Sequence, residues 1–346
     1  MRRLGLAALV LFGACRAPTA ESRWLDEPPF RRAALERSLE EDTAYARLRR
    51  SQWAAWQSLP EWSPIEVSLA ARSGDRVALA ALGREAFFHY PVQRAPEGAR
   101  EEGHGMQHLA RVGEQTHLTC ATCHTHEGVV GAPNRDLDLG AALVDAHPNA
   151  PAEARAVALS WGKGRADVSS TTGSEPARIP DLRPVRWQRS LQWSGAVRQH
   201  DVTSLAARIE TLIITSEPTR RPPPAIALGL AIFLHGLSDA LPPAPPNAVF
   251  AKHCSECHEG PGLSGGLVDV DEVGTDPGLA RSLERGTGSY RVPSLRGVGT
   301  RGALMHDGSI VDLEVLLDPS RAGGHRYGLE LTVAERGQLL AWLRGL

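Results

Sequence analysis

One five-residue pattern occurs twice in this chain and constrains its fold more than any other feature. It reads Cys-x-x-Cys-His at residues 120–124 and again at residues 254–258. Two thiols one helical turn apart can form thioethers to the two vinyl groups of one porphyrin, and the histidine that follows can bind the iron. The pattern therefore predicts two covalently attached c-type haems, with these attachment residues and iron ligands: Cys120, Cys123 and His124 for the first, and Cys254, Cys257 and His258 for the second.

A zinc site and a redox-active dithiol are the alternative interpretations of these cysteines. Four cysteines with histidine suit zinc in principle, and a lone Cys-x-x-Cys pair is typical of thioredoxin-like proteins. Apart from these four cysteines the chain has only Cys15. Two complete copies of the five-residue pattern, with no other cysteine beyond the N-terminus, favour haem over both alternatives.

The N-terminus resembles a bacterial export signal. Arg2 and Arg3 precede an apolar run over residues 4–13, which is too short to span a bilayer as a permanent helix. The run ends in Phe-Gly-Ala-Cys15, which is similar to a lipobox, so residues 1–15 are expected to be a lipoprotein signal peptide with lipidation at Cys15. The alternative is an ordinary signal peptide cleaved nearby. Either route predicts export to the periplasm, and lipidation would anchor the protein to a membrane.

The length of 346 residues allows two or three domains, and a proline-rich linker at residues 241–247 marks the clearest boundary. We expect a helical N-terminal extension and linker over residues 16–75, a first haem domain over residues 76–241 and a second over residues 247–346. Helical periodicity is expected over these ranges: 31–56, 77–90, 205–214, 225–237 and 332–346. The formal net charge of −2 disfavours a nucleic-acid partner.

Residues 91–119 are expected to form a long polar loop rather than regular structure. Several glycines interrupt this range, which also holds His104, His108 and His117. The three histidines are expected to be solvated, and the alternative is that one of them reaches the open face of the first haem.

The chain also contains an internal repeat. Residues 180–185 read Pro-Asp-Leu-Arg-Pro-Val, and residues 293–298 read Pro-Ser-Leu-Arg-Gly-Val. At the same distance beyond each valine, Trp193-Ser-Gly-Ala-Val matches His306-Asp-Gly-Ser-Ile. The shared spacing predicts a mostly α protein built from two tandem cytochrome c-like haem domains related by pseudo-twofold duplication.

These residues together resemble the bacterial di-haem cytochrome c peroxidase family, which includes the methylamine-utilisation di-haem enzyme. The resemblance covers residues 77–346 and rests on these segments: Leu82-Gly-Arg84, Phe87-Phe88, the first haem motif, Trp193-Ser-Gly195, Arg291-Val-Pro-Ser-Leu-Arg296 and Met305-His-Asp-Gly-Ser309. The segment from Gly324 to Gly328 also looks like the tail of di-haem rubber oxygenases.

The resemblance leaves the second axial ligand of each haem open. The family's methionine ligand of the second haem corresponds here to Ser320, so His325 is the expected distal ligand, with Tyr327 and Met305 as rivals. The family's capping histidine of the first haem falls near Leu159, ahead of the segment at Trp161, and leucine cannot bind iron. We therefore expect the first haem to stay open, unless His147 or a loop histidine binds it.

The resemblance also implies roles for three further residues. Glu217 is the expected proton acceptor and donor at the first haem, with Glu210 as the alternative. Trp193 matches the tryptophan that carries electrons between the haems, and a core tryptophan is the alternative. Asp167 resembles the position of an inter-domain calcium ion, whose other ligands are backbone oxygens near Arg291 and Pro293.

The expected function is a periplasmic di-haem peroxidase that reduces hydrogen peroxide at the first haem. A small cytochrome or a cupredoxin would donate the electrons, through the second haem, and a homodimer is compatible with the resemblance. The alternatives are an oxidase that acts on a partner protein, an oxygenase of the rubber-cleaving kind, and a non-catalytic electron-transfer cytochrome.

Overall fold

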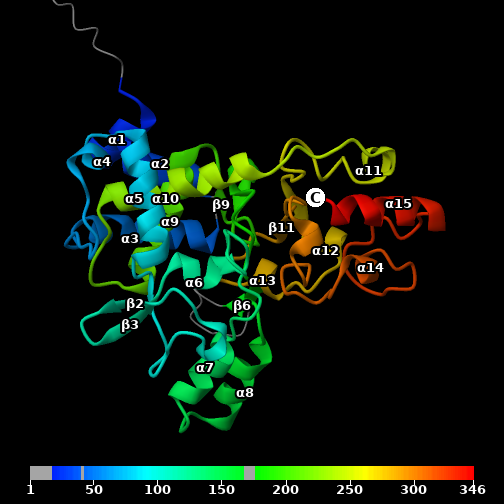
Figure 1. Ribbon diagram of the computed structural model, residues 1–346, viewed down its shortest axis with the longest axis horizontal. Coiled ribbons are helices and arrows are strands. Elements are labelled where there is room, and N and C mark those ends of the chain that lie inside the picture. The colour runs from blue at the N-terminus through cyan, green and yellow to red at the C-terminus, as the bar shows by residue number, and fades with distance from the viewer. Residues whose placement is uncertain (1–17, 40–42, 167–175) are drawn as a thin grey trace, which may run out of the picture.

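The structure, a computed structural model, describes residues 18–39, 43–166 and 176–346 (Figure 1). Cys15 and Asp167, which the sequence assigns to lipidation and to calcium, lie outside the described residues. Within the described ranges helices predominate and strands are short, in agreement with the mostly α class predicted from the sequence. No described helix is long and apolar enough to cross a membrane.

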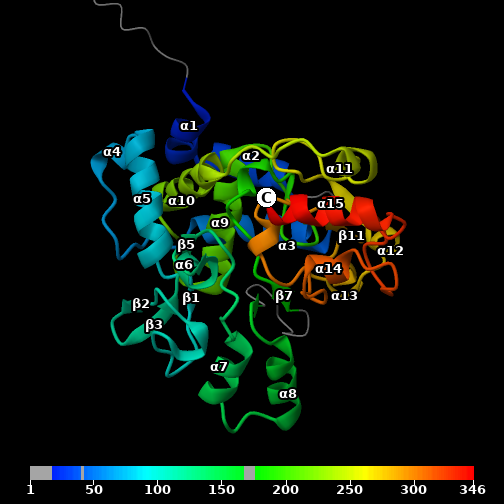
Figure 2. The same ribbon diagram turned by 45° about the vertical axis from the view of Figure 1, so that its right-hand side comes forward.

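The helices of the N-terminal part precede the proline-rich linker. They are α1 (Ala20–Asp26), α2 (Pro28–Ser38), α3 (Ala44–Gln57), α4 (Leu69–Arg72), α5 (Arg76–His89), α6 (Cys120–His124), α7 (Leu139–Ala146), α8 (Ala152–Trp161), α9 (Val202–Ser216) and α10 (Pro224–Gly236), with the 3₁₀ turns η1 (Gly103–Gly105), η2 (Val185–Trp187) and η3 (Leu237–Ala240). The α7 and α8 pair projects from the body of the molecule in both views (Figures 1 and 2).

The helices of the C-terminal part are shorter apart from the last one. They are α11 (Ala248–His253), α12 (Val270–Val273), α13 (Gly278–Arg281), α14 (Leu313–Leu316) and α15 (Val333–Arg344), with the 3₁₀ turn η4 (Val298–Thr300). The side chain of Thr332 and that of Glu335 cap α15 reciprocally, in keeping with the Thr-x-x-Glu pattern at residues 332–335.

The strands form only small antiparallel sheets. They are β1 (Gln93–Arg94), β2 (Ala110–Val112), β3 (Gln115–Leu118), β4 (Thr125–His126), β5 (Val129–Val130), β6 (Arg165–Ala166), β7 (Ala177–Arg178), β8 (Ser190–Leu191), β9 (Val197–Arg198), β10 (Leu267–Asp269) and β11 (Ser289–Arg291). Their order is β1-β3-β2 in the one three-stranded sheet described, and the other sheets pair β4 with β5, β6 with β7, β8 with β9 and β10 with β11.

The N-terminal extension packs into the same apolar core as the first haem motif. Trp24, Tyr45, Trp53 and Trp56 of the extension share one buried cluster with residues of α5, α9 and α10. The indole Nε1 of Trp24 donates to the carbonyl of Pro224, 3.1 Å away, at the start of α10. The tryptophans of the extension therefore stabilise the helices beneath the first haem motif.

Helices α5 and α10 approach each other at two glycines. A Cβ atom on Gly83 would lie 1.9 Å from the carbonyl oxygen of Gly229, so neither a larger residue nor a shifted register fits there. The Leu-Gly-Arg segment that contributes to the family resemblance thus has a packing reason, because its glycine lets the two helix backbones touch.

A buried acid holds the extension to α9. The side chain of Glu210 is fully buried, and its carboxylate lies 3.8 Å from the Nη1 of Arg221. Burial raises the pKa of Glu210, while the charges of Arg31 and Arg221 lower it. Arg31 is anchored in turn by donating from Nη1 to the carbonyl of Trp24 at 2.9 Å. Glu210 of α9 is therefore a structural residue that faces Arg31 of α2.

The C-terminal part has its own apolar core, which α11, α14 and α15 surround. Its buried members include Phe250, Leu313, Leu317, Leu339 and Leu343. The rings of Phe250 and Trp342 lie 4.6 Å apart at an interplanar angle of 35°. The linker predicted at residues 241–247 has no helix or strand and leads from η3 to α11.

The two segments of the sequence repeat have the same local structure. A 3₁₀ turn begins at Val185 and another at Val298. Further along, Leu191 pairs with Val197 across an antiparallel bridge, and Leu304 pairs with Ile310 in the same way. Each bridge closes a turn with positive φ at equivalent positions: Gln192 and Gly195 in the first copy, and Met305 and Gly308 in the second.

Two sequence expectations differ from the structure. The helical stretch expected over residues 31–56 is divided into α2 and α3, because Leu39 leaves helical geometry with φ −84° and ψ 130°. The polar loop expected over residues 91–119 contains the β1-β3-β2 sheet. Its alternation of inward and outward side chains is short and is interrupted by glycines, so the periodicity was too weak to indicate strands.

We expect replacement of Trp24 by alanine to destabilise the protein strongly, since it removes a fully buried indole and its hydrogen bond to Pro224. Loss of a buried tryptophan costs about 3–5 kcal/mol of unfolding free energy. Urea denaturation followed by far-ultraviolet circular dichroism measures the effect. Val77→Ala, at an 80% exposed position of α5, is the control and should change stability by less than about 0.5 kcal/mol. Equal effects of the two variants would contradict this packing.

Candidate functional site

The first Cys-x-x-Cys-His motif is the single helical turn α6. The side chains of Thr119 and Thr122 form a capping box at its start, and the hydroxyl of Thr119 donates to the carbonyl of His108 at 2.8 Å. The two thiols face different apolar clusters, because Cys120 packs against the main N-terminal core and Cys123 against a cluster that contains Met106 and Trp161. The motif therefore lies between two apolar surfaces.

Buried Asn134, which the sequence analysis did not single out, fixes the backbone of this motif. Its Nδ2 donates to the carbonyls of Gly105 and Thr122, at 2.8 and 2.9 Å, and its backbone N–H donates to the carbonyl of Cys123. Only the short spacing from the motif could have indicated this role, because a single asparagine in a loop has many other uses.

The imidazole of His124 is oriented by a backbone carbonyl. Its Nδ1 lies 3.0 Å from the carbonyl oxygen of Pro180, the first residue of the repeated segment. A carbonyl can only accept, so Nδ1 carries the proton and the lone pair of Nε2 is left for a metal. Burial lowers the pKa of His124 to about 4, which keeps the ring neutral at physiological pH.

The second motif repeats this arrangement. The backbone N–H of His258 donates to the carbonyl of Cys254 at 3.0 Å, so the motif forms one helical turn beyond α11. The Nδ1 of His258 donates to the carbonyl of Leu263 at 3.1 Å, and burial lowers the pKa of this ring to about 4. The carbonyl of Pro293, the counterpart of Pro180, also faces the ring. Both motif histidines are thus neutral and have Nε2 free to bind a metal.

A largely apolar cavity brings the second motif and the tail of the chain together. Its lining includes Cys254, Cys257, His258 and His325. The rings of His258 and His325 have centroids 6.4 Å apart at an interplanar angle of 52°. His325 has a φ of 55°, and its backbone N–H donates to the carbonyl of Val273 at 2.7 Å, so the loop that carries the ring is fixed.

The two rivals of His325 line the same cavity. The hydroxyl of Tyr327 donates to Glu272 at 2.7 Å, and this hydrogen bond to a carboxylate raises the pKa of Tyr327 to about 12. A phenol with a raised pKa is a poor source of the phenolate that binds iron. Met305 has a φ of 68° within the second turn of the repeat, and its Cε lies close to Gly324.

Buried arginines line one side of this cavity. Arg178, Arg291 and Arg301 are at most 7% exposed, and burial lowers the pKa of Arg178 and of Arg291 to about 9. Each has at least one guanidinium nitrogen that is buried without a hydrogen-bond partner. Unpaired buried donors are costly, so these side chains fit a bound group that carries carboxylates beside an apolar body. The propionates and ring of a porphyrin meet this description.

Trp193 lies where the two halves of the chain meet. Its ring packs with Val270, Leu279 and Tyr290 of the C-terminal half and lines the cavity of the second motif. The guanidinium carbons of Arg178 and Arg291 lie 5.0 and 4.8 Å from its centroid. Its Nε1 donates to the carbonyl of Arg178 at 2.8 Å.

Glu217 lies at the end of α9, close to the strand that precedes the first motif. Its Oε2 is 3.6 Å from the Nε2 of His117, and its Oε1 is 3.9 Å from Arg220. The side chain of Glu217 is 19% exposed, whereas that of His117 is only 1% exposed. The expectation that His117 is solvated is therefore wrong, because β3 turns this residue inward and burial lowers its pKa.

The other histidine candidates at the first motif, and Leu159, have different surroundings. His104 forms an ion pair with Asp145 at 2.9 Å, and the ring of His108 packs edge-on against Phe88 at 5.1 Å. His147 is exposed at the end of α7. Leu159 is 54% exposed on α8, so this side chain points to solvent and not to the motif.

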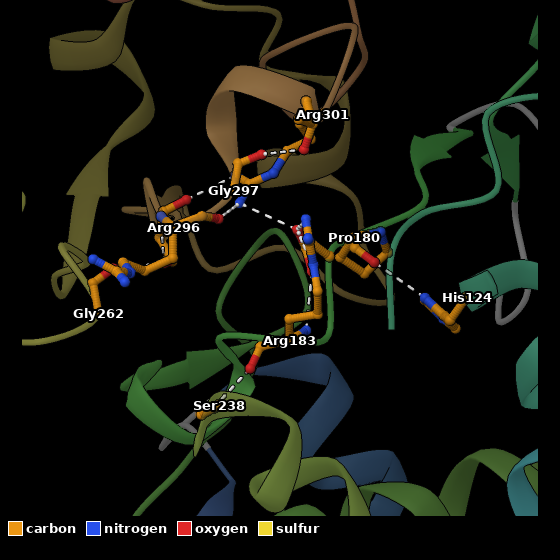
Figure 3. A network of polar contacts seen from close by, with 11 residues as sticks. His124, Pro180, Arg183, Ser238, Gly262, Arg296, Gly297 and Arg301 are labelled. Atoms are coloured by element: carbon orange, nitrogen blue, oxygen red, sulfur yellow. Dashed lines mark hydrogen bonds and ion pairs between the residues drawn. The ribbon is translucent and has the colours of Figure 1, made fainter. Parts of the chain in front are cut away.

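A network of polar contacts leads from His124 of the first motif to Gly262 of the C-terminal half (Figure 3). From Pro180, which holds His124, it passes to Asp181, whose carboxylate accepts from Arg183 at 2.6 Å and lies 3.6 Å from Arg301. Arg301 donates to the carbonyl of Ser294, and the hydroxyl of Ser294 donates to the carbonyl of Gly262, beside the residue that holds His258.

The geometry is unfavourable for the zinc and dithiol alternatives. Among the described residues no group of three or more His, Cys, Asp or Glu side chains is placed to hold a metal ion. Burial raises the pKa of Cys120 and Cys123 to about 12 and that of Cys254 to about 11. Redox-active dithiols need a lowered thiol pKa, so these cysteines suit covalent attachment better than thiol exchange.

No protein-family model and no curated protein sequence matches the chain. One similar solved structure is a MauG-like protein associated with microbial copper homeostasis. It is 18% identical with a TM-score of 0.42, and the match covers 83% of this chain and 92% of that one. A similarity this distant carries no argument about the site, whose interpretation rests on its own geometry.

Asp181→Asn should destabilise the protein by about 3–5 kcal/mol, because it leaves Arg183 and Arg301 buried beside a neutral amide. Chemical denaturation measures the change. The control is Asp239→Asn, which breaks an exposed pair with Arg186 and should cost less than about 1 kcal/mol. If the two variants unfold at the same denaturant concentration, Asp181 does not organise the junction.

Proposed function

We propose that this chain is a di-haem c-type peroxidase, which reduces hydrogen peroxide to water with electrons from a small cytochrome or a cupredoxin. The observation that carries the proposal is the placement of Trp193. This residue lines the cavity of the second motif, and it is hydrogen-bonded to Arg178, two residues before the proline that holds His124. One aromatic ring thus connects two sites that each have a neutral, oriented histidine.

Both motifs suit covalent haem. Their thiols are free and one helical turn apart, and each histidine presents Nε2. When bound, the two haems would supply the one-electron iron chemistry by which peroxide is reduced. The repeated turns at Trp193 and His306 support our further proposal that the two halves are cytochrome c-like domains related by duplication.

We infer that His325 would hold the iron of the second haem together with His258. Two imidazole nitrogens that bind one metal at about 2 Å each bring their ring centroids to roughly 6–6.5 Å, since each centroid lies little more than 1 Å behind its nitrogen. The observed separation of 6.4 Å matches. A site with two protein ligands suits electron transfer, which makes the second motif the point of electron entry.

Glu217 is the proposed proton carrier at the first motif. Peroxide cleavage needs a group that takes a proton from one oxygen and returns it to the other. The carboxylate of Glu217 lies beside His117, whose strand leads directly into the first motif. Arg220 is close enough to hold the carboxylate in place. Glu210, the sequence alternative, is fully buried on α9 near Arg31 and Arg221, which favours a structural role.

A non-catalytic electron-transfer cytochrome is the second candidate, and Met106 favours it. This methionine is 1% exposed and belongs to the cluster against which Cys123 packs. If its sulfur bound the first iron, both sites would have two protein ligands and none would remain for peroxide. The first haem would then be six-coordinate in the resting protein.

We also propose that the protein acts in the periplasm. The apolar run and Cys15 support export to the periplasm as a lipoprotein, where c-type haem is attached. Release of a lipid-modified N-terminal peptide, detected by mass spectrometry, is the direct observation that would support this location.

Replacing Glu217 by glutamine should lower peroxide turnover by about 10²–10⁴-fold while both haems stay bound, because the amide cannot carry the proton. Steady-state oxidation of a reduced small cytochrome measures turnover, and the absorption spectrum gives the number of haems bound per chain. Glu114→Gln, at an exposed turn between β2 and β3, is the matched control and should leave turnover unchanged. Near-normal turnover of Glu217→Gln would refute the role of this carboxylate.

Replacing His325 by alanine should convert the second haem from a low-spin to a high-spin spectrum, because one of its two imidazole ligands is removed. Electron paramagnetic resonance of the oxidised protein reports the change. Tyr327→Phe keeps the ring and removes only the hydroxyl bonded to Glu272, so this control should stay low-spin. A spectral change in the tyrosine variant alone would assign the ligand to Tyr327.

A further inference from the structure

A second pocket lies at the junction of the two halves, next to the cavity of the second motif. The described residues that line it are Pro133, Arg135, Lys163, Gly164, Arg165, Arg178, Arg301, Ala303 and Gly308. Five of them are basic and none is acidic. They come from the loop after β5, the β6-β7 hairpin, the segment after η4 and the second turn of the repeat, so both halves contribute.

Two of the five basic side chains are buried and incompletely paired. Arg178 and Arg301 are 7% and 5% exposed, and the Nη1 of Arg178 and the Nε of Arg301 have no hydrogen-bond partner. Burial, together with the charges of neighbouring arginines, lowers the pKa of both groups. Mutual repulsion of this kind is relieved by an anion and increased by a cation.

Among the described residues, the nearby carboxylates compensate these five cations only in part. Asp181 is bonded mainly to Arg183, and its distance to Arg301 is 3.6 Å. Asp307 has only a minor effect on the pKa of Arg178. Glu127 is 79% exposed and lies 4.0 Å from Arg135. Arg165 donates to the carbonyls of Trp161 and Gly308, at 3.2 and 3.4 Å, and these oxygens carry no net charge.

We propose that the junction pocket binds an anion, either a carboxylate or an inorganic oxyanion, rather than a cation. Planar guanidinium groups with several donors suit both carboxylate and phosphate oxygens. A calcium ion needs six to eight oxygen ligands. The described residues place no group of three or more acidic, histidine or cysteine side chains for a metal, and here they place five cations instead.

The expected experimental result depends on the source of the anion. A free oxyanion would bind to the purified protein from solution, whereas a carboxylate of a bound porphyrin would occupy the pocket from the start. Arg178 and Arg301 line both cavities, so either source can reach them. Anion binding from either source is independent of peroxide turnover. The anion proposal can therefore fail while the proposed function holds, and the proposed function can fail while the anion proposal holds.

The test is the melting temperature of the purified haem-loaded protein, titrated with phosphate at constant ionic strength, and separately with calcium and with a calcium chelator. Saturable stabilisation by phosphate is expected for a free oxyanion. The stabilisation by phosphate should be lost in Arg165→Gln and in Lys163→Gln. Because Lys163 is exposed, its replacement should not affect folding. Arg155→Gln removes the same charge from the exposed face of α8 and should keep the full response.

If phosphate has no effect, a crystal structure of the haem-loaded protein grown without added oxyanions decides the question. A porphyrin carboxylate within hydrogen-bond distance of Arg165, Arg178 or Arg301 would support the proposal with the second source. Water alone in the pocket, or a calcium ion there, would overturn it. Stabilisation by calcium together with destabilisation by the chelator would overturn it as well.

Discussion

The junction of the two halves depends on the backbone of Arg178. Its carbonyl accepts a hydrogen bond from the indole N–H of Trp193, and its own N–H donates to the carbonyl of His306. The donor–acceptor distance is 2.8 Å in both hydrogen bonds. Trp193 and His306 occupy equivalent positions in the repeat. One residue of strand β7 therefore joins the first copy of the turn to the second. Because Pro180, which orients His124, lies only two residues beyond Arg178, the position of the first motif is tied to the cavity of the second.

The positive charges of several arginines are buried at this junction, and the described residues place few negative charges beside them. Asp181 is the buried carboxylate that contacts both Arg183 and Arg301, while Arg178 and Arg291 stack on Trp193. Stacking on an aromatic face stabilises a cation only modestly. The guanidinium nitrogens that are buried without a hydrogen-bond partner still lower the stability of the fold. The energetic case for bound anions follows from this imbalance. It holds for the cavity beside the second motif and for the junction pocket, since Arg178 and Arg301 line both.

Local patterns in the sequence predicted local structure well. The capping box of α15 and the apolar face of α5 depend on neighbours a few residues apart, which a sequence displays directly. The sequence also indicated His325 as a partner of the second motif, and the structure brings their rings within 6.4 Å. The inward turn of His117 and the burial of Glu210 were missed, because each depends on strands or helices that are distant in the chain. The arginine junction was also missed, since its members are scattered from residue 135 to residue 301.

The repeat explains why the two sites differ although their motifs are alike. Both copies form the same turn, but the first presents an indole and the second an imidazole. His306 stacks on Tyr290 at 4.1 Å and bonds to its hydroxyl at 3.0 Å, so this ring is held within the C-terminal half. Trp193 instead leaves its own half and packs among C-terminal residues. The repeated turn thus links the two halves through its first copy only, because Trp193 reaches the other half whereas His306 is bound within its own.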